Sequence, residues 1–344
     1  MSKRSKNKRK SIMIAQAPKP QTASPPLLNL GYHDAATVVT REHLRTQIIV
    51  AGCGGIGAYV VQHVGRLMCT IYDDQKGVNL TLVDPDVVEE KNLGRQLFCE
   101  AEVGEPKAVA LARRYGQAWG LNTSAYVGEF DEKLILRDVV DLVVLVGCVD
   151  NARARATLHE ALGNNPERTT PHTLPTIWWL DCGNLKDTGR VLLGSAYAYE
   201  QMRGAFARPN PESKRFTHCM SLPSPALQYP SLLIPEPGET QHSALSTQHL
   251  SCAELQAANL QSLNINAGIA VQAADMLTRF VVTQDLKRYQ CAVNLASGSV
   301  KSSYCTPSEV AREIGKPVDY VTRQEGHEEA VMQFLREQQQ GAAA

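Results

Sequence analysis

The sequence predicts an α/β fold in which helices cover both faces of a doubly wound, mainly parallel β-sheet. Short apolar runs of strand type alternate along the chain with segments of helical periodicity, and this alternation is typical of parallel sheets. The first apolar run passes directly into a glycine-rich turn, which lets the backbone turn sharply into a helix. We expect strands at residues 48–51, 80–83, 124–127, 142–146 and 176–181, and helices after residue 57 and over 107–119, 131–138 and 151–162.

The remainder of the chain breaks this alternation. Residues 189–198 are expected to add an antiparallel strand to the sheet. Seven prolines between residues 203 and 248 exclude regular structure, so this stretch is predicted to be a long crossover segment or lid. Two strands at 289–295 and 299–304 should be joined at Gly298. A long helix is expected over 260–282, and its apolar side chains fall largely on one face, namely Ile265, Ile269, Ala273, Leu277 and Phe280.

A capping motif predicts one more helix near the end of the sequence. Thr306 offers an N-cap hydroxyl, Pro307 suits the first helical turn, and Glu309 follows the cap by three residues. The C-terminal extension is therefore expected to begin as a helix, whereas the run of Gln, Gly and Ala after Glu337 should fray.

The glycine-rich turn and the next strand end indicate a nucleotide site. Glycines at this position let the backbone approach a phosphate or ribose closely, and the following helix directs its N-terminal amides toward an anion. Asp84 ends the next apolar run, where a carboxylate can accept hydrogen bonds from ribose hydroxyls. The glycines concerned are Gly52, Gly54, Gly55 and Gly57.

A set of polar and basic residues that follows Asp84 in the sequence distinguishes a nucleoside triphosphate site from a dinucleotide site. The set comprises Asn92, Arg95, Gln96 and Lys107. Arginine gives planar contacts to phosphate oxygens through several donors, and lysine adds a point charge. Taken singly, Gly54 and Gly57 could serve only helix packing, and Lys107 could be a solvated surface charge. Together, these residues favour a triphosphate site.

With these motifs the chain resembles the ThiF/MoeB/HesA family of ubiquitin-activating-enzyme-like adenylyltransferases. The family pattern is Gly-x-Gly-Gly-x-Gly, then Asp-x-Asp-x-Val, Asn-x-x-Arg-Gln and Lys, and finally an Asp-Asn pair, here Asp150-Asn151. The resemblance implies a Rossmann-like fold in which the four glycines shape the nucleotide loop. It further implies that Asp84 holds the ribose with Asp86 beside it, that Asn92, Arg95, Gln96 and Lys107 line the phosphates, and that Asp150 holds magnesium.

The resemblance also implies an activity and a domain organisation. An enzyme of this kind uses magnesium and ATP to adenylate the C-terminal carboxylate of a small ubiquitin-like or sulfur-carrier-like protein that ends in glycine, and it releases pyrophosphate. A homodimer is expected, with Arg41 or Arg45 of the second subunit near the phosphates. The expected parts are a basic tail (1–30), an ATP-binding adenylation domain (31–200), a crossover loop or lid (201–259), a helix and strands that complete this domain (260–305), and a helical extension (306–344).

Other functions remain open at this point. An NAD-dependent oxidoreductase would use residues 52–84 but leaves Arg95, Lys107 and Asp150 without a role. A family member that adenylates a tRNA-bound carboxylate would explain the basic tail. A non-catalytic half of a heterodimer would ordinarily have lost the arginine or the magnesium acid. Within the family, the length and the proline-rich crossover resemble most the ThiF-type protein of the plasmid-associated PRTRC system.

Nine scattered cysteines argue for reduced thiols over a disulfide framework. The family's zinc-binding Cys-x-x-Cys pairs are missing, and the nearest substitute is His218-Cys219 with His249 and Cys252, so zinc is not expected. A thioester cysteine would need exposure and a lowered pKa. Among Cys182, Cys219 and Cys252 we favour Cys252, although the absence of a thioester ranks first.

The charge of the chain is unevenly distributed. The first 20 residues hold seven of the 35 basic residues and no acid, so the rest carries 28 basic against 35 acidic residues. We expect this tail to be a solvated, disordered extension, with nucleic-acid binding as the alternative. Because no apolar stretch suits a signal peptide or a span of ~20 residues, a cytoplasmic location is expected.

Overall fold

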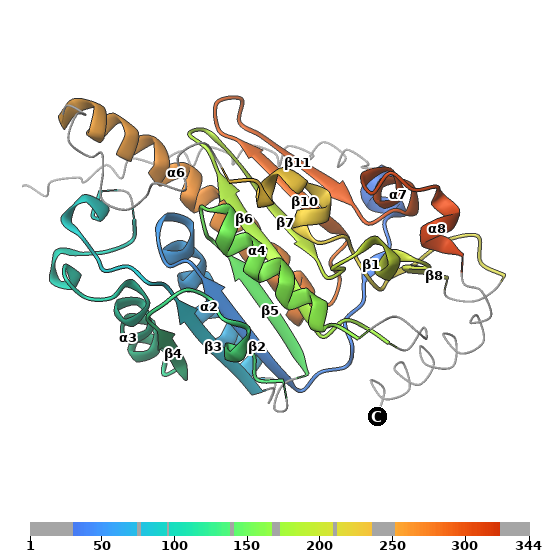
Figure 1. The fold of residues 1–344 in the computed structure, drawn as a ribbon, viewed down its shortest axis with the longest axis horizontal. Coiled ribbons are helices and arrows are strands. Elements are labelled where there is room, and N and C mark those ends of the chain that lie inside the picture. The colour runs from blue at the N-terminus through green and yellow to red at the C-terminus, as the bar shows by residue number, and fades with distance from the viewer. Residues whose placement is uncertain are drawn as a thin grey trace, which may run out of the picture.

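The computed structural model describes residues 30–73, 77–94, 96–137, 141–166, 173–208, 212–235 and 252–323. An eight-stranded sheet has the order β11-β10-β7-β6-β5-β2-β3-β4 (Figure 1). Its neighbouring strands from β4 to β6 are all parallel, as the alternating pattern predicts. These five strands are β2 (Arg45–Ala51), β3 (Gly77–Val83), β4 (Thr123–Tyr126), β5 (Leu142–Gly147) and β6 (Ile177–Asn184).

Three antiparallel strands extend the sheet beyond β6. They are β7 (Thr188–Gly194), β10 (Arg288–Asn294) and β11 (Ser299–Tyr304), each antiparallel to its neighbour. Gly298 turns the chain between the last two strands with a φ of +65°, a conformation that favours glycine. The predicted antiparallel addition and the joined strand pair are therefore confirmed.

Helices lie on both faces of this sheet. The alternating residues of β6 show why, because Trp178 and Leu180 belong to the core beneath α2 (Gly55–Asp73) and α6 (Cys252–Leu277), whereas Ile177 and Trp179 pack toward α4 (Ala152–Ala161). A strand buried on both faces must be apolar throughout. The doubly wound fold is thus confirmed. The other helices are α1 (Leu30–Asp34), α3 (Lys107–Trp119), α5 (Pro225–Gln228), α7 (Pro307–Glu313) and α8 (Val318–Thr322).

The long helix predicted over 260–282 is present, although it begins earlier. α6 continues as a π-helical turn over Thr278–Val282. The five apolar side chains of its predicted stripe are at most 1% exposed, and α6 packs on α2, β6 and β7 of the same chain. This stripe is therefore covered within one chain. It gives no support to a homodimer.

Two sequence expectations about irregular segments are corrected. The predicted helix 131–138 is absent from residues 131–137, which hold one 3-10 turn over Glu132–Leu134. The side chain of Gln47 donates to the carbonyl of Leu134 at 2.8 Å and accepts from the amide of Leu136 at 2.9 Å, so these backbone groups are unavailable to a helix. Strand and turn contacts have overridden local propensity.

The described part of the proline-rich stretch contains short regular elements. β8 (Phe206–Ala207) and β9 (His218–Cys219) form a small sheet with β1 (Thr37–Val38). Pro225 takes the first turn of α5, where a missing N–H costs nothing, and Ser224 caps that helix. The prolines therefore shape this segment without excluding regular structure.

The predicted C-terminal capping motif is also present. The Thr306 hydroxyl accepts a hydrogen bond from the amide of Glu309 at 3.2 Å, and the Glu309 carboxylate accepts one from the amide of Tyr304 at 2.6 Å. In the described part of the chain, no helix is both long enough and apolar enough to cross a membrane.

Candidate functional site

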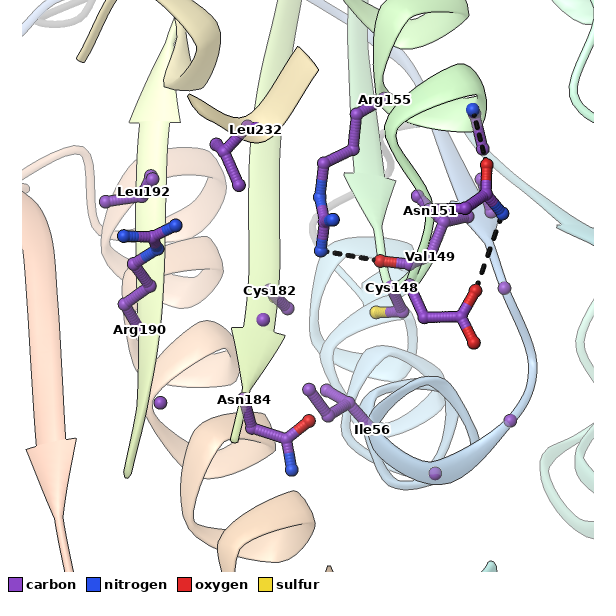
Figure 2. A pocket seen from close by; sticks show the side chains of 18 of the residues that line it. Ile56, Cys148, Val149, Asn151, Arg155, Cys182, Asn184, Arg190, Leu192 and Leu232 are labelled. Carbon is purple, nitrogen blue, oxygen red and sulfur yellow. Dashed lines mark hydrogen bonds between the residues drawn. The ribbon is translucent and has the colours of Figure 1, made fainter. Parts of the chain in front are cut away.

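A pocket of about 1170 Å³ opens at the carboxyl ends of the parallel strands. Its nucleotide end, as the sequence predicts it, lies where β2 and β5 end side by side. The sheet order reverses between these two strands, because β3 lies on one side of β2 and β5 on the other. Ligands of doubly wound proteins bind at such a switch point. Figure 2 shows one part of the pocket, with Arg155 of α4 and Arg190 of β7 on either side of Cys182 and Asn184, which belong to β6.

The glycine loop owes its shape to close packing. Gly52 has a φ of +90°, and a Cβ there would lie 2.5 Å from the carbonyl oxygen of Cys148. A Cβ at Gly57 would lie 1.8 Å from the carbonyl oxygen of Gly52. Only glycine fits either position. Gly52, Gly54 and Gly55 line the pocket, but Gly57 does not, so its role is to let α2 pack against the loop.

Asp84 holds the glycine loop from beneath. It is 5% exposed, and its two carboxylate oxygens accept hydrogen bonds from the amides of Cys53 at 2.6 Å and Asp86 at 2.8 Å. Burial raises the pKa of Asp84, and the amides of Cys53 and Asp86 partly oppose that rise. Because each carboxylate oxygen has a further lone pair, Asp84 can still accept hydrogen bonds from a ligand in the pocket that it lines.

Lys107 is a buried residue of the pocket and not a surface charge. Its side chain is only 8% exposed, and its Nζ lies 2.8 Å from Oδ2 of Asp86, whose own side chain is 64% exposed. The Lys107 amide also donates to the Asp86 carbonyl at 2.9 Å. A lysine is rarely buried unless it is paired. The pair therefore places a cation at the pocket wall with its carboxylate partner facing solvent.

The three predicted phosphate residues between Asp86 and Lys107 differ in their placement. Gln96 lines the pocket, and its Oε1 is buried without a hydrogen-bond partner. Asn92 is 2% exposed, accepts a hydrogen bond from the amide of Glu89 at 2.8 Å and does not line the pocket. Arg95 lies outside the described residues. The structure thus brings Gln96 to the site and assigns Asn92 a local structural contact.

Asp150 and its neighbours line the pocket in the turn that follows β5, beside the glycine loop. Asp150 is exposed in the pocket and accepts a weak hydrogen bond from the Asn151 amide group at 3.4 Å. The Asn151 side chain also caps α4 by accepting from the amide of Ala154 at 2.8 Å. The cap fixes the turn in which Asp150 lies, and this turn follows β5 directly.

Arg155 is a pocket residue that the sequence analysis missed. Its Nη2 donates to the carbonyl of Val149 at 2.7 Å, and its Nε lies 3.3 Å from Oδ1 of Asp181, as Figure 2 shows for the first of these contacts. Burial raises the pKa of Asp181, and the charge of Arg155 opposes that rise. The signal that could have found it is its spacing, since Arg155 lies one helical turn after Asn151 on α4.

The site fits ATP and magnesium by the chemistry of its donors. The glycine cradle and the buried Lys107 suit an anionic ligand, and the unpartnered Oε1 of Gln96 can accept a hydrogen bond from a ligand donor. Asp150 offers one hard carboxylate, and magnesium is commonly held by one or two carboxylates together with substrate phosphates. Among the described residues there is no cluster of three or more His, Cys, Asp or Glu that could hold a metal by itself.

The described cysteines proposed for thioester or zinc chemistry are buried. Cys182 is 1% exposed and Cys219 is 0% exposed. The Cys219 thiol donates to the carbonyl of Ser221 at 3.4 Å, and Nδ1 of His218 bonds to the Thr217 hydroxyl at 2.9 Å. His249 and the side chain of Cys252 lie outside the described residues. The preference for Cys252 therefore stays a prediction.

Residues 32–178 match the model of the ThiF family. This segment contains the glycine loop, Asp84, Lys107 and Asp150. It holds β2, β3, β4 and β5 and only the first two residues of β6. The resemblance that the motifs indicate is thereby confirmed.

The curated relatives match about a third of the chain. The SAMP-activating enzyme E1 of Haloferax volcanii is 32% identical over 123 residues, which are 34% of this chain and 41% of that protein. The adenylyltransferase and sulfurtransferase MOCS3 of Mus musculus is 36% identical over 119 residues, or 33% of this chain and 24% of that protein. The chain thus spans less than half the length of these relatives.

Among solved structures, E. coli MccB with AMPCPP and MccA is similar at a TM-score of 0.44. Its sequence identity is 15%, and the match covers 75% of this chain and 63% of that one. PaaA is similar at a TM-score of 0.45 with 13% identity, covering 76% and 64% of the two chains.

Proposed function

We propose that this chain is an ATP-dependent adenylyltransferase that activates the C-terminal carboxylate of a small ubiquitin-like or sulfur-carrier-like protein. The observation that carries the proposal is the convergence of Asp84, Gln96, Lys107 and Asp150 on one pocket at the switch point of the sheet. In an oxidoreductase, the buried Lys107 and the second carboxylate, Asp150, would have no role beside Asp84. The two curated relatives are named as an activating enzyme and an adenylyltransferase, which agrees with this class.

The chain's own residues would mainly position and neutralise the reacting groups. In the reaction, a carboxylate oxygen of the substrate attacks the α-phosphorus of ATP, the bond to the bridging oxygen breaks, and pyrophosphate leaves. Lys107 would stabilise phosphate charge, Asp84 would accept from the ribose, and the loop amides near Gly54 would face phosphate oxygens. Asp150 would hold magnesium, which supplies further neutralisation of the phosphates. Positioning and charge stabilisation can account for most of the acceleration in such transfers.

The finer features of the proposal rest on sequence resemblance. The substrate protein is expected to end in glycine, and a homodimer is proposed in which Arg41 of the second subunit approaches the phosphates. Arg45 is the weaker candidate, because it pairs within its own chain with Asp141 at 3.3 Å. Within the family, the PRTRC group is the proposed subgroup. A tRNA-bound carboxylate is the alternative substrate, and it would not change the chemistry at the α-phosphorus.

Calorimetry with ATP and NAD tests the proposal without knowledge of the substrate protein. Full-length protein should bind ATP in the presence of magnesium, more weakly when EDTA is present, and NAD should give little heat. Asp150→Asn should reduce the magnesium dependence, because one ligand charge is lost. Tight NAD binding together with undetectable ATP binding would refute the proposed function.

A further inference from the structure

Beyond its nucleotide end, the pocket extends over the antiparallel part of the sheet. In the register of β7, β10 and β11, Arg190 opposes Ala292, and Ala292 opposes Lys301. Directly opposed residues of antiparallel strands project from the same face of a sheet. All three residues line the pocket, so this row is part of its floor.

The two ends of the pocket differ in charge. None of the residues of β7, β10 and β11 that line the pocket is acidic, and two of them, Arg190 and Lys301, are basic. The nucleotide end is instead lined by four carboxylates, those of Asp84, Asp86, Glu129 and Asp150. Protein charges of the same sign as a ligand repel it, and charges of the opposite sign fix its position. The floor therefore suits a ligand segment that carries negative charge.

Arg190 is held in place but keeps free donors. Its guanidinium carbon lies 4.2 Å from the ring centroid of Tyr229, and such a stack fixes the plane of the group while its N–H edges stay available. Among the described residues, the side chains of Arg190 and Lys301 make no hydrogen bond and no ion pair. Asp181 attracts Arg190 through space, but its bonded partner is Arg155.

The neighbouring row of the floor has its polar groups already satisfied. The Gln290 amide donates to Oε1 of Gln228 at 3.1 Å, and the Ser303 hydroxyl donates to Oε1 of Gln290 at 3.0 Å. The cationic donors of the floor are both in the row of Arg190. Because neighbouring strands are ~4.8 Å apart, the Cα atoms of Arg190 and Lys301 are roughly 10 Å apart, with only the small, exposed Ala292 between them. Both long side chains can reach a group above Ala292.

We propose that Arg190 and Lys301 select an acidic side chain in the C-terminal segment of the substrate protein. That segment would lie extended across the floor, with its acidic side chain above Ala292 and its terminal carboxylate at the nucleotide end. The inference rests on the proposed adenylyltransferase function, because that function supplies the reason for a chain terminus in this pocket.

Short peptides provide the probe. We would use heptapeptides that end in Gly-Gly and carry a fluorophore on the N-terminal amine. One Glu is placed in turn at each earlier position of a Gln and Ala background. Binding to full-length protein is measured by anisotropy with magnesium and a non-hydrolysable ATP analogue present. At least one Glu peptide should bind about tenfold more tightly than its Gln parent, as a charged hydrogen bond implies. Arg190→Gln and Lys301→Gln should each reduce that preference.

Controls separate this inference from the function on which it rests. Lys133→Gln removes a positive charge at a side chain that is 88% exposed and does not line the pocket, and it should leave the preference intact. The double variant Arg190→Glu with Lys301→Glu should prefer Lys in place of Glu. The affinity for magnesium ATP should be unchanged in these variants, and a fall in Arg190→Gln would assign this residue to the phosphates and overturn the inference.

Two further results would also decide the matter. One result is that wild-type protein binds magnesium ATP but prefers no Glu peptide, or binds no peptide at millimolar concentration. The proposed selection of an acidic side chain is then wrong, and the adenylyltransferase proposal survives. If wild-type protein does not bind magnesium ATP, the proposed function fails, and this inference fails with it.

Discussion

The buried ion pair between Arg155 and Asp181 is the contact beside the pocket with the largest expected contribution to stability. The Arg155 side chain is 13% exposed and that of Asp181 is 0% exposed, and Nε lies 3.3 Å from Oδ1. Oδ2 of Asp181 already has no hydrogen-bond partner in the structure. Arg155→Met would leave both oxygens unpaired. Removing one partner of a buried pair costs about 3–5 kcal/mol, a large share of the ~5–15 kcal/mol of a typical domain.

The loss should depend on pH, because Asp181 can take up a proton. Burial raises the pKa of Asp181, and Arg155 opposes that rise, so the folded-state pKa should be higher still in Arg155→Met. A carboxyl whose pKa is raised by folding contributes stability below its unfolded pKa, near 3.8, and that stability is lost as pH rises through the folded-state pKa. Urea denaturation should therefore show a larger loss at pH 7.5 than at pH 5.

A matched control lies two residues earlier on the same helix. Arg153 is 83% exposed and pairs with Glu129, itself 66% exposed, so Arg153→Met should change stability little. Adding Asp181→Asn to Arg155→Met should recover part of the loss, since it removes the buried charge. The reasoning is refuted by a loss within the ~1 kcal/mol of surface pairs, or by an equal loss at both pH values.

Three further substitutions test the glycine loop, the proposed magnesium ligand Asp150 and the thiol of Cys182. Gly57→Ala should unfold or strongly destabilise the protein, because its Cβ would lie 1.8 Å from the carbonyl oxygen of Gly52. Gly54→Ala places no atom nearer than 3.7 Å to the new Cβ, so this variant should keep the melting temperature of the wild type. Equal melting temperatures of the two variants would contradict this reasoning. Asp150→Ala should lower ATP-pyrophosphate exchange with a confirmed substrate by a hundredfold or more while the melting curve is kept, and unchanged exchange would remove Asp150 from the site. Cys182→Ser should retain exchange, because adenylation needs no thiol; loss of exchange in a folded variant would count against that.

The fold could be predicted where packing follows the local pattern. The strands β2 and β5 are covered on both faces, and their sequences are accordingly continuous apolar runs. The helix α3 begins and ends at the residues that its helical pattern predicts. The segment after Asp131 failed because Gln47, distant in sequence, captures its backbone. No local propensity encodes a contact of that kind.

The site could be predicted only in part, for a similar reason. Glycine spacing and strand-end acids are local signals, and they placed Asp84 and Asp150 in the pocket. Asn92 shares the same motif, yet its amide is taken by the backbone of Glu89. The pairing of Arg155 with Asp181 depends on the register of β5 with β6, which brings together residues 26 positions apart. Sequence spacing alone does not show it.

If the two proposals hold, the two halves of the sheet separate nucleotide chemistry from substrate choice. The parallel strands must end together for the loop after β2 and the turn after β5 to face one ligand, so substitutions there disturb the reaction itself. The row of Arg190, Ala292 and Lys301 lies on strands that contribute no residue to the glycine loop or to the turn of Asp150. Its side chains can therefore change without altering the backbone that holds ATP. If acidic selection is correct, exchanging charges in this row should redirect the enzyme to a different carboxyl-terminal sequence at constant nucleotide affinity.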